Sequence, residues 1–291
     1  MSVKHPIIAI TGSSGAGTTT VKKAFEEIFR RGGYHPAIIE GDSFHRYDRK
    51  GMKEAVLTAD KEDRNLSHFG PEANLLSKLE DLFHRYSETG AGHVRKYLHD
   101  EEEAAPYNQQ PGTFTPWEDI KPNTDMLFYE GLHGGVVSSD VNVAQWVDLL
   151  VGVVPSVNLE WIQKISRDVS ERGYSPEAVT HTILRRMPDY VKYITPQFTH
   201  SHINFQRVPL VDTSNPFIAR DIPSPDESLV VIRFNKYRDQ DYTYLLSMIH
   251  DSFMSRPNTL VIPGGKMGFA MQIILRPLVA EMMEKRHKAM E

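Results

Sequence analysis

The residues of this chain whose types and spacing could do chemistry begin with a glycine-rich loop near the N-terminus. Its glycines would let several backbone N–H groups converge on one anion, and a helix pattern follows whose N-terminal dipole adds to that attraction. The order strand, Gly-x-x-x-x-Gly, hydroxyl residues, helix therefore predicts a phosphate-binding P-loop. Thr18 stands where such a loop usually has a lysine, so a fixed positive charge is missing. The loop comprises Gly12, Ser13, Ser14, Gly15, Ala16, Gly17, Thr18, Thr19 and Thr20.

Two carboxylates follow short apolar runs elsewhere in the chain. Asp42 comes just after residues 37–40, and Glu130 ends residues 126–130. Ligands of open α/β sheets bind at the carboxyl ends of strands, so both side chains are expected to face the glycine-rich loop. Glu130 has the form of a Walker B carboxylate and predicts a Mg²⁺ site shared with the hydroxyl of Thr19 or Thr18. Asp42, followed by His45, Arg46 and Arg49, suits a hydroxyl substrate that already carries an anionic group.

Cationic side chains gather further along the chain. Lys164, Arg167 and Asp168 share one face of a predicted helix, and Arg172 follows before a glycine. A second helix is expected from Pro176 and carries two adjacent arginines. A phosphoryl-transfer site needs a cation, and the loop lacks its lysine, so we predict that residues 158–195 form a helical lid that supplies the charge.

The elements that must position these groups alternate along the sequence. Apolar runs that predict strands are separated by helical patterns, which favours a doubly wound α/β fold. We expect a single domain over residues 1–291, with a substrate-side excursion at about 50–122. Within it, a helix is expected to start at Pro71 and a strand to span residues 94–100. Pro209 lies inside a strand pattern and predicts a sheet edge.

Composition limits the class of protein. The net charge of −5 and pI near 6.2 argue against a protein that coats nucleic acid. The chain has no cysteine, which excludes disulfides, thiolate metal sites and thiol redox control. The N-terminal residues lack a signal-peptide pattern, and no run reaches the length of a membrane span, so we expect a cytoplasmic protein with no membrane partner.

Taken together, five motifs closely resemble the bacterial class of phosphoribulokinase, in order and over nearly the whole chain. They lie at residues 11–19, 40–46, 128–134, 157–164 and 211–217. In that class a threonine also replaces the P-loop lysine, and the absence of cysteine separates the chain from the thiol-switched plant type. The resemblance implies a fold like that of uridine kinase and other small-molecule P-loop kinases, with a mixed, mainly parallel sheet and a helical lid. It also implies ATP- and Mg²⁺-dependent phosphorylation of the C1 hydroxyl of ribulose 5-phosphate, a Calvin-cycle step.

The resemblance also implies roles for individual residues. The general base falls on Asp42, the metal-associated carboxylate on Glu130, and the lid cation on Lys164, with Arg167 and Asp168 beside it. We assign contacts with the sugar phosphate to His45, Arg49, Tyr97, His99, Arg172 and Arg185. The class resembles NADH-activated, AMP-inhibited homo-oligomers, whose effector-linked arginines match Arg31, Arg233 and Arg256.

Two alternatives remain open at this stage. A kinase of the same fold could act on a nucleoside, pantothenate or another sugar phosphate, although His45, Arg49 and Arg172 favour a substrate that already carries a phosphate. A nucleotide-binding regulator could have lost its chemistry together with the lysine. The retained Asp42 and Glu130 argue against a regulator, because a protein that only binds nucleotide needs no base.

Overall fold

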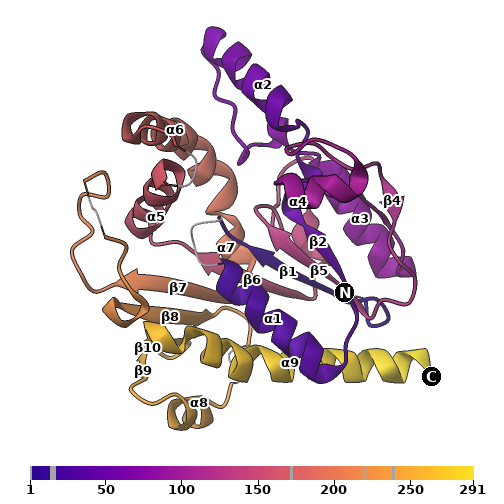
Figure 1. Cartoon of the computed structure of the whole chain (residues 1–291). Helices are drawn as coiled ribbons and strands as arrows, with labels where there is room; N and C mark the ends of the chain where they lie inside the picture. Colours follow the sequence, from indigo (N-terminus) through magenta and orange to yellow (C-terminus); the bar gives the residue numbers. More distant parts are fainter. Residues whose placement is uncertain (1, 14–17, 171–172, 219–220, 238–239) are drawn as a thin grey trace.

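The centre of the molecule is an eight-stranded sheet with the strand order β2-β5-β1-β6-β7-β8-β10-β9 (Figure 1). The computed structural model describes residues 2–13, 18–170, 173–218, 221–237 and 240–291. The first five strands of that order run parallel, and the last three join through antiparallel pairs. The predicted mixed, mainly parallel α/β sheet is therefore confirmed. The strands are β1 (Ile7–Thr11), β2 (Pro36–Glu40), β5 (Met126–Gly131), β6 (Leu149–Val154), β7 (Ile203–Pro209), β8 (Ser228–Phe234), β9 (Phe253–Arg256) and β10 (Thr259–Pro263).

Helices cover both faces of this sheet, because alternate side chains of a strand point to opposite sides. On β1, Ile8 and Ile10 join an apolar core with α1 and α9, whereas Ile7 and Ala9 join a second core with α3 (Figure 1). Among the described residues, none of these helices is long and apolar enough to cross a membrane. The helices are α1 (Thr18–Gly32), α2 (Arg49–Lys61), α3 (Leu76–Thr89), α4 (Glu101–Ala104), α5 (Val157–Ser170), α6 (Pro176–Asp189), α7 (Gln197–His200), α8 (Tyr242–Met248) and α9 (Met267–Met290).

The packing of α1 against the sheet positions the glycine-rich loop. Phe25 and Phe29 face inward, and their rings lie 5.0 and 5.2 Å from the ring of Phe128 on β5. The loop therefore joins the end of β1 to a helix fixed against the neighbouring strand. A Cβ atom at Gly12 would lie 2.7 Å from the carbonyl oxygen of Val153, so the chain passes here too closely for a side chain.

The expected helix from Pro71 begins instead at Leu76. Pro71 starts a single 3₁₀ turn, and Asn74 after it is extended because its side chain bonds elsewhere. The Asn74 amide donates to the carbonyl oxygens of His68 and Gly70, at 2.8 and 2.7 Å. A local tertiary contact thus prevails over the helical pattern of the sequence.

The expected strand over residues 94–100 is also wrong in extent. Regular pairing covers only β3 (His93–Val94) with β4 (Glu118–Asp119), and the chain beyond pairs irregularly with residues 113–115. Pro209 does not mark a sheet edge, because β7 lies between β6 and β8. Pro209 is the last residue of β7, and the pairing with β6 already stops at Gln206, so no partner strand needs its missing N–H.

Asp148 joins the starts of β6 and β1. Its Oδ2 accepts a hydrogen bond from the backbone N–H of Ile7 at 2.9 Å. Burial raises the pKa of Asp148 to about 6, although the bond from Ile7 opposes the shift. The folded state therefore favours the neutral carboxyl. The stability that the neutral Asp148 carboxyl group gives the fold is fully present below the ordinary pKa of 3.8 and is lost as pH rises through about 6.

We predict that Asp148→Asn raises the free energy of unfolding at pH 8 by on the order of 1–2 kcal/mol, because an uncharged acceptor replaces a partly buried charge. The gain should shrink as pH falls through about 6. Asp148→Ala removes the acceptor and should destabilise the protein at every pH. Urea unfolding across this pH range measures both variants, and an Asn variant less stable than the parent at pH 8 would contradict the account.

Candidate functional site

Three strands bring the candidate groups to one edge of the sheet. Glu130 near the end of β5 lies opposite Ile10 of β1 on one side and Glu40 of β2 on the other. Gly41, which follows β2, passes so close to β5 that a Cβ there would lie 2.8 Å from the Cα of Gly131. The glycine-rich loop, Glu130 and the turn that holds Asp42 therefore leave the sheet side by side, as expected at the carboxyl ends of parallel strands.

Asp42 lies in the 3₁₀ turn Gly41–Phe44 and is paired with His45. The Nε2 atom of His45 is 3.1 Å from Asp42 Oδ1, and the opposite ring atom, Nδ1, is 2.9 Å from Asn74 Oδ1. The NH₂ group of Asn74 donates to two carbonyl oxygens, which turns its Oδ1 toward the imidazole of His45. Asn74 thus orients the buried imidazole with Nε2 toward the carboxylate.

The environment of Asp42 favours its ionised form. Burial alone would raise the pKa of Asp42, but the hydrogen bond from His45 and the nearby His99 lower it below the ordinary value. The side chain still keeps 42% of its surface accessible. Asp42 is therefore a carboxylate at neutral pH that can accept a proton from a bound hydroxyl group.

The predicted substrate residues Arg49, Tyr97 and His99 lie beside Asp42. His99 Nε2 is 3.8 Å from Asp42 Oδ2, and the Tyr97 ring centre is 4.9 Å from that of His99. Arg49, the first residue of α2, donates through Nη2 to the carbonyl oxygen of His99 at 2.7 Å. The structure thus brings the excursion and the start of α2 together around the turn after β2.

Two further histidines lie in this group and were not predicted as site residues. The ring of His68 is tilted against that of His45 with centres 4.4 Å apart, and His133 Nε2 is 3.0 Å from the carbonyl oxygen of Phe69. Burial lowers the pKa of His68 to about 3 and that of His133 to about 4. Both are neutral at pH 7, so they add hydrogen-bonding surface and no charge.

Helix α5 brings the predicted lid residues close to the loop. Lys164 contacts Asp168, and Arg167 Nε lies 3.4 Å from Asp168 Oδ1. Burial lowers the pKa of Lys164, against the effect of its partner Asp168. One turn earlier, Glu160 lies beside the hydroxyl of Ser13, and burial raises the pKa of Glu160. The first half of α5 therefore contacts the start of the glycine-rich loop.

The two adjacent arginines of α6 point to different places. Arg185 donates to the carbonyl oxygen of Leu66 at 3.0 Å and lies 3.9 Å from Asp60, so its contacts are with the end of α2 and the chain that follows it. Arg186 instead lies within electrostatic range of both His68 and Lys164. It therefore connects the histidine group with the lid, and the sequence could not show which of two neighbouring arginines faces inward.

Thr18, Thr19 and Thr20 begin α1, with Thr20 exposed. Outside the described residues are Ser14, Gly15, Ala16, Gly17 and Arg172.

The surroundings of Glu130 fit a magnesium ion. Lys22 of α1 makes an ion pair with Glu40 at 3.0 Å. Burial alone would lower the pKa of Lys22, but the nearby carboxylates of Glu40 and Glu130 raise it above its ordinary value. Among the described residues, no three His, Asp or Glu side chains gather as a ready metal site. A divalent ion here would combine Glu130 with a hydroxyl, phosphate oxygens and water, which is the ligand set that Mg²⁺ favours.

The three arginines predicted to respond to an effector lie on two parts of the fold. Arg233 on β8 and Arg256 on β9 both pair with Thr259 of the intervening strand, and both are exposed. Arg31 near the end of α1 pairs with Glu27. The structure thus places two of the three arginines in one row at the antiparallel end of the sheet.

Comparisons with known proteins agree with this geometry. Residues 7–214 match the model of the phosphoribulokinase / uridine kinase family. A chromosomal phosphoribulokinase of Cupriavidus necator is 65% identical over 290 residues, 99% of each chain, and a probable phosphoribulokinase of Escherichia coli is 60% identical over 98% of each. A solved phosphoribulokinase from Rhodobacter spheroides superposes with a TM-score of 0.91 at 53% identity, over 98% of this chain and 100% of that one. The chain therefore belongs to the phosphoribulokinase / uridine kinase family, as its five motifs predicted.

Proposed function

We propose that this protein transfers the γ-phosphoryl group of ATP to the C1 hydroxyl of D-ribulose 5-phosphate and forms ribulose 1,5-bisphosphate, the Calvin-cycle step that makes the carbon dioxide acceptor. The observation that carries the proposal is the ionised Asp42, held by His45 at the edge where β1, β2 and β5 end beside the glycine-rich loop. Curated relatives named phosphoribulokinase at 57–65% identity support the same substrate.

In this mechanism the C1 hydroxyl oxygen of the sugar forms a bond to the γ-phosphorus of ATP. Asp42 accepts the proton that this hydroxyl group loses. At the same time the γ-phosphorus loses its bond to the β–γ bridging oxygen. That oxygen leaves as part of ADP and keeps the electron pair. The backbone of the glycine-rich loop holds the phosphates. Lys164 and Arg167 approach from α5 and offset the charge of the transferring group. When bound by Glu130 and Thr19, Mg²⁺ neutralises part of the triphosphate charge.

The remaining candidate residues suit a substrate that already carries a phosphate. Arg49 begins α2 beside His45 and His99, so cationic and polar groups surround the acceptor side of Asp42. A nucleoside carries no phosphate group that these cationic side chains could bind. We therefore assign the 5-phosphate and the sugar hydroxyls to the group His45, Arg49, Tyr97, His99 and Arg172.

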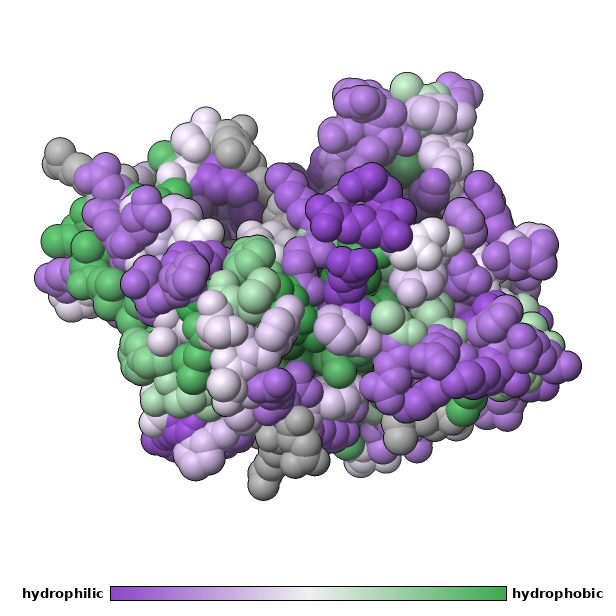
Figure 2. Space-filling view, turned by 90° about the horizontal axis from the view of Figure 1, so that it is seen from below, coloured by the Kyte–Doolittle hydropathy of each residue, from purple (hydrophilic) through white to green (hydrophobic). Residues whose placement is uncertain are grey.

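We also propose that the protein works in the cytoplasm as a homo-oligomer activated by NADH. An exposed apolar group on the loop after β7 supports a protein contact, because large apolar patches on a soluble surface usually mark interfaces. This loop lies at the left of Figure 2, where apolar residues gather. Its exposed members are Leu210, Val211, Phe217, Ile218 and Ile222.

Replacement of the base tests the mechanism. Asp42→Asn should lower kcat by about 10²–10⁴-fold with a small change in KM, because the amide cannot accept the proton. Asp100→Asn is the matched control: Asp100 caps α4 next to His99, and asparagine caps equally well. Steady-state ADP release measures both variants. Near-normal kcat in Asp42→Asn would remove Asp42 from the mechanism.

Replacement of the lid cation tests the source of the missing charge. Lys164→Met should lower kcat by on the order of 10²-fold while the melting temperature changes little, since the lysine acts on the transferring phosphoryl group. Lys288→Met is the control, because Lys288 makes an ion pair with Glu284 at the same helical spacing on α9. If both variants turn over at the same rate as the parent, the lid does not replace the P-loop lysine.

Titration with NADH tests the proposed regulation. NADH should raise kcat/KM by about five-fold or more, a coupling of ordinary strength. Arg233→Gln and Arg256→Gln should weaken this response without lowering the basal rate, whereas Arg276→Gln, an exposed change on α9, should leave it intact. Sedimentation velocity on the same samples reports the oligomer. A response that survives in both β8 and β9 variants would contradict the assignment.

A further inference from the structure

Gln197, the first residue of α7, is a polar side chain in the interior. Only 1% of its surface is exposed. A buried amide is costly unless its hydrogen-bonding groups are satisfied. Here both ends of the amide are bonded, which identifies it as a fixed connection between segments that are distant in the sequence.

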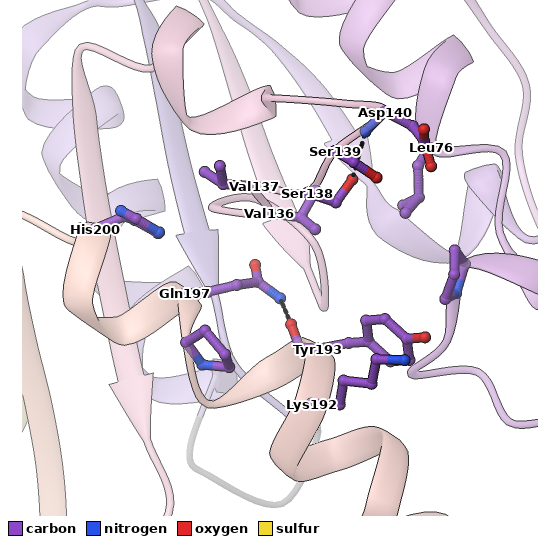
Figure 3. Close-up of a pocket in the computed structure, with 12 residues that line it drawn as sticks. Leu76, Val136, Val137, Ser138, Ser139, Asp140, Lys192, Tyr193, Gln197 and His200 are labelled. Carbon is purple, nitrogen blue, oxygen red and sulfur yellow. Dashed lines mark hydrogen bonds between the residues drawn. The ribbon is translucent and has the colours of Figure 1, made fainter.

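The hydrogen bonds of Gln197 reach two distant segments and the helical turn that precedes α7. Its Oε1 accepts from the Thr11 hydroxyl at 2.9 Å and from the backbone N–H of Gly135 at 3.0 Å. Its Nε2 donates to the carbonyl oxygens of Leu132 and Tyr193, both at 2.8 Å. Figure 3 shows the side chain reaching from α7 with the bond to Tyr193 drawn.

Each segment leads directly to a part of the candidate site. Thr11 is the last residue of β1, next to Gly12 of the glycine-rich loop. Leu132 and Gly135 belong to the chain that leaves β5 just after Glu130. Tyr193 lies in the π-helical turn Tyr190–Ile194, which continues α6 toward α7. Gln197 therefore joins the loop, the predicted metal carboxylate and the far end of the lid.

The packing around this side chain is open on one side. A cavity of about 270 Å³ separates the chain after β5 from the end of the lid. Val136 and Ser139 line one wall, Tyr193 and His200 line the other, and Gln197 lies between them (Figure 3). Because the cavity interrupts apolar packing between the two walls, their relative position depends more on the hydrogen bonds of the Gln197 amide. The turn Tyr190–Ile194 next to it is π-helical, and such turns are frequent at functional sites.

We propose that Gln197 is a positioning residue that couples the end of the lid to the glycine-rich loop and to Glu130. It acts through Thr11, Leu132 and Tyr193 and does not touch the reactants. The inference rests on the proposed kinase function. When the bonds are intact, the lid, the phosphate-binding backbone and the metal carboxylate keep one relative placement. When they are lost, the nucleotide and its metal are held less accurately, whereas the sugar-phosphate group around His45 is unaffected.

The test compares Gln197→Met, which keeps the length of the side chain and removes its hydrogen bonds, with the parent. We expect kcat to fall by on the order of 10–100-fold, as misplacement of reacting groups produces. The Mg²⁺ concentration for half-maximal rate and the Kd for MgATP should rise, while KM for ribulose 5-phosphate stays unchanged. Thr11→Val, a subtler change, should shift the same quantities. Its effect should not add fully to that of Gln197→Met, because both break one connection.

Asn235→Ala is the matched control. The Asn235 amide donates to the carbonyl oxygens of Phe198 and Ser201 at 3.3 and 3.1 Å, so it anchors the opposite side of α7 without reaching β1 or β5. It should lower the melting temperature and leave the Mg²⁺ dependence unchanged. Equal effects of Asn235→Ala and Gln197→Met on Mg²⁺ dependence would overturn the proposal, as would a normal Mg²⁺ dependence in Gln197→Met and Thr11→Val.

Failure of the proposed function gives a different result. If the parent protein does not phosphorylate ribulose 5-phosphate, the substrate assignment falls, and calorimetric binding of MgATP then decides the role of Gln197. Weaker MgATP binding in Gln197→Met and Thr11→Val, but not in Asn235→Ala, would still support the coupling. Equal Kd values in all variants would overturn it.

Discussion

Parallel pairing of β1, β2 and β5 is the constraint on which the rest of the site depends. Glu130 lies level with Ile10 and Glu40, and the N–H of Gly12 bonds the carbonyl oxygen of Gly131 at 3.3 Å. Because side chains alternate along a strand, a slip of one residue would turn Glu130 to the opposite face of the sheet. The apolar cores on both faces prevent such a slip, so hydrophobic packing far from the chemistry sets the spacing of its charged groups.

The negative and positive charges of the site come from different parts of the fold, the turn after β2 and the helices α2, α5 and α6. The negative charge is that of the ionised Asp42, which lies among histidine side chains. Burial keeps two of these, His68 and His133, neutral. Positive charge arrives mainly on helices, from Arg49 at the start of α2 and from Lys164 and Arg186 on α5 and α6. We propose that a cation carried by such a helix approaches the phosphates when the substrate is bound and so compensates for the threonine in place of the loop lysine.

The sequence predicts the strands that form the site well, because β1, β2 and β5 are each apolar runs that end at or beside a polar residue. Asp42 and Glu130 were predicted to meet for that reason. It could not reveal His68 or Gln197, whose surroundings come from contacts across the fold. The choice between Arg185 and Arg186 depends on how α6 is rotated, and Pro209 was misleading because the pairing with β6 ends before it. Long-range packing decides these cases, and one sequence does not show it.

The most direct test of the account is ADP release by the purified protein with MgATP and a panel of acceptors. The panel holds ribulose 5-phosphate, two other pentose phosphates, uridine and pantothenate. The account predicts that ribulose 5-phosphate has by far the highest kcat/KM, and that the product carries its new phosphate on C1 by ³¹P NMR. A preference for uridine or pantothenate, or ATP binding without turnover on any acceptor, would contradict it.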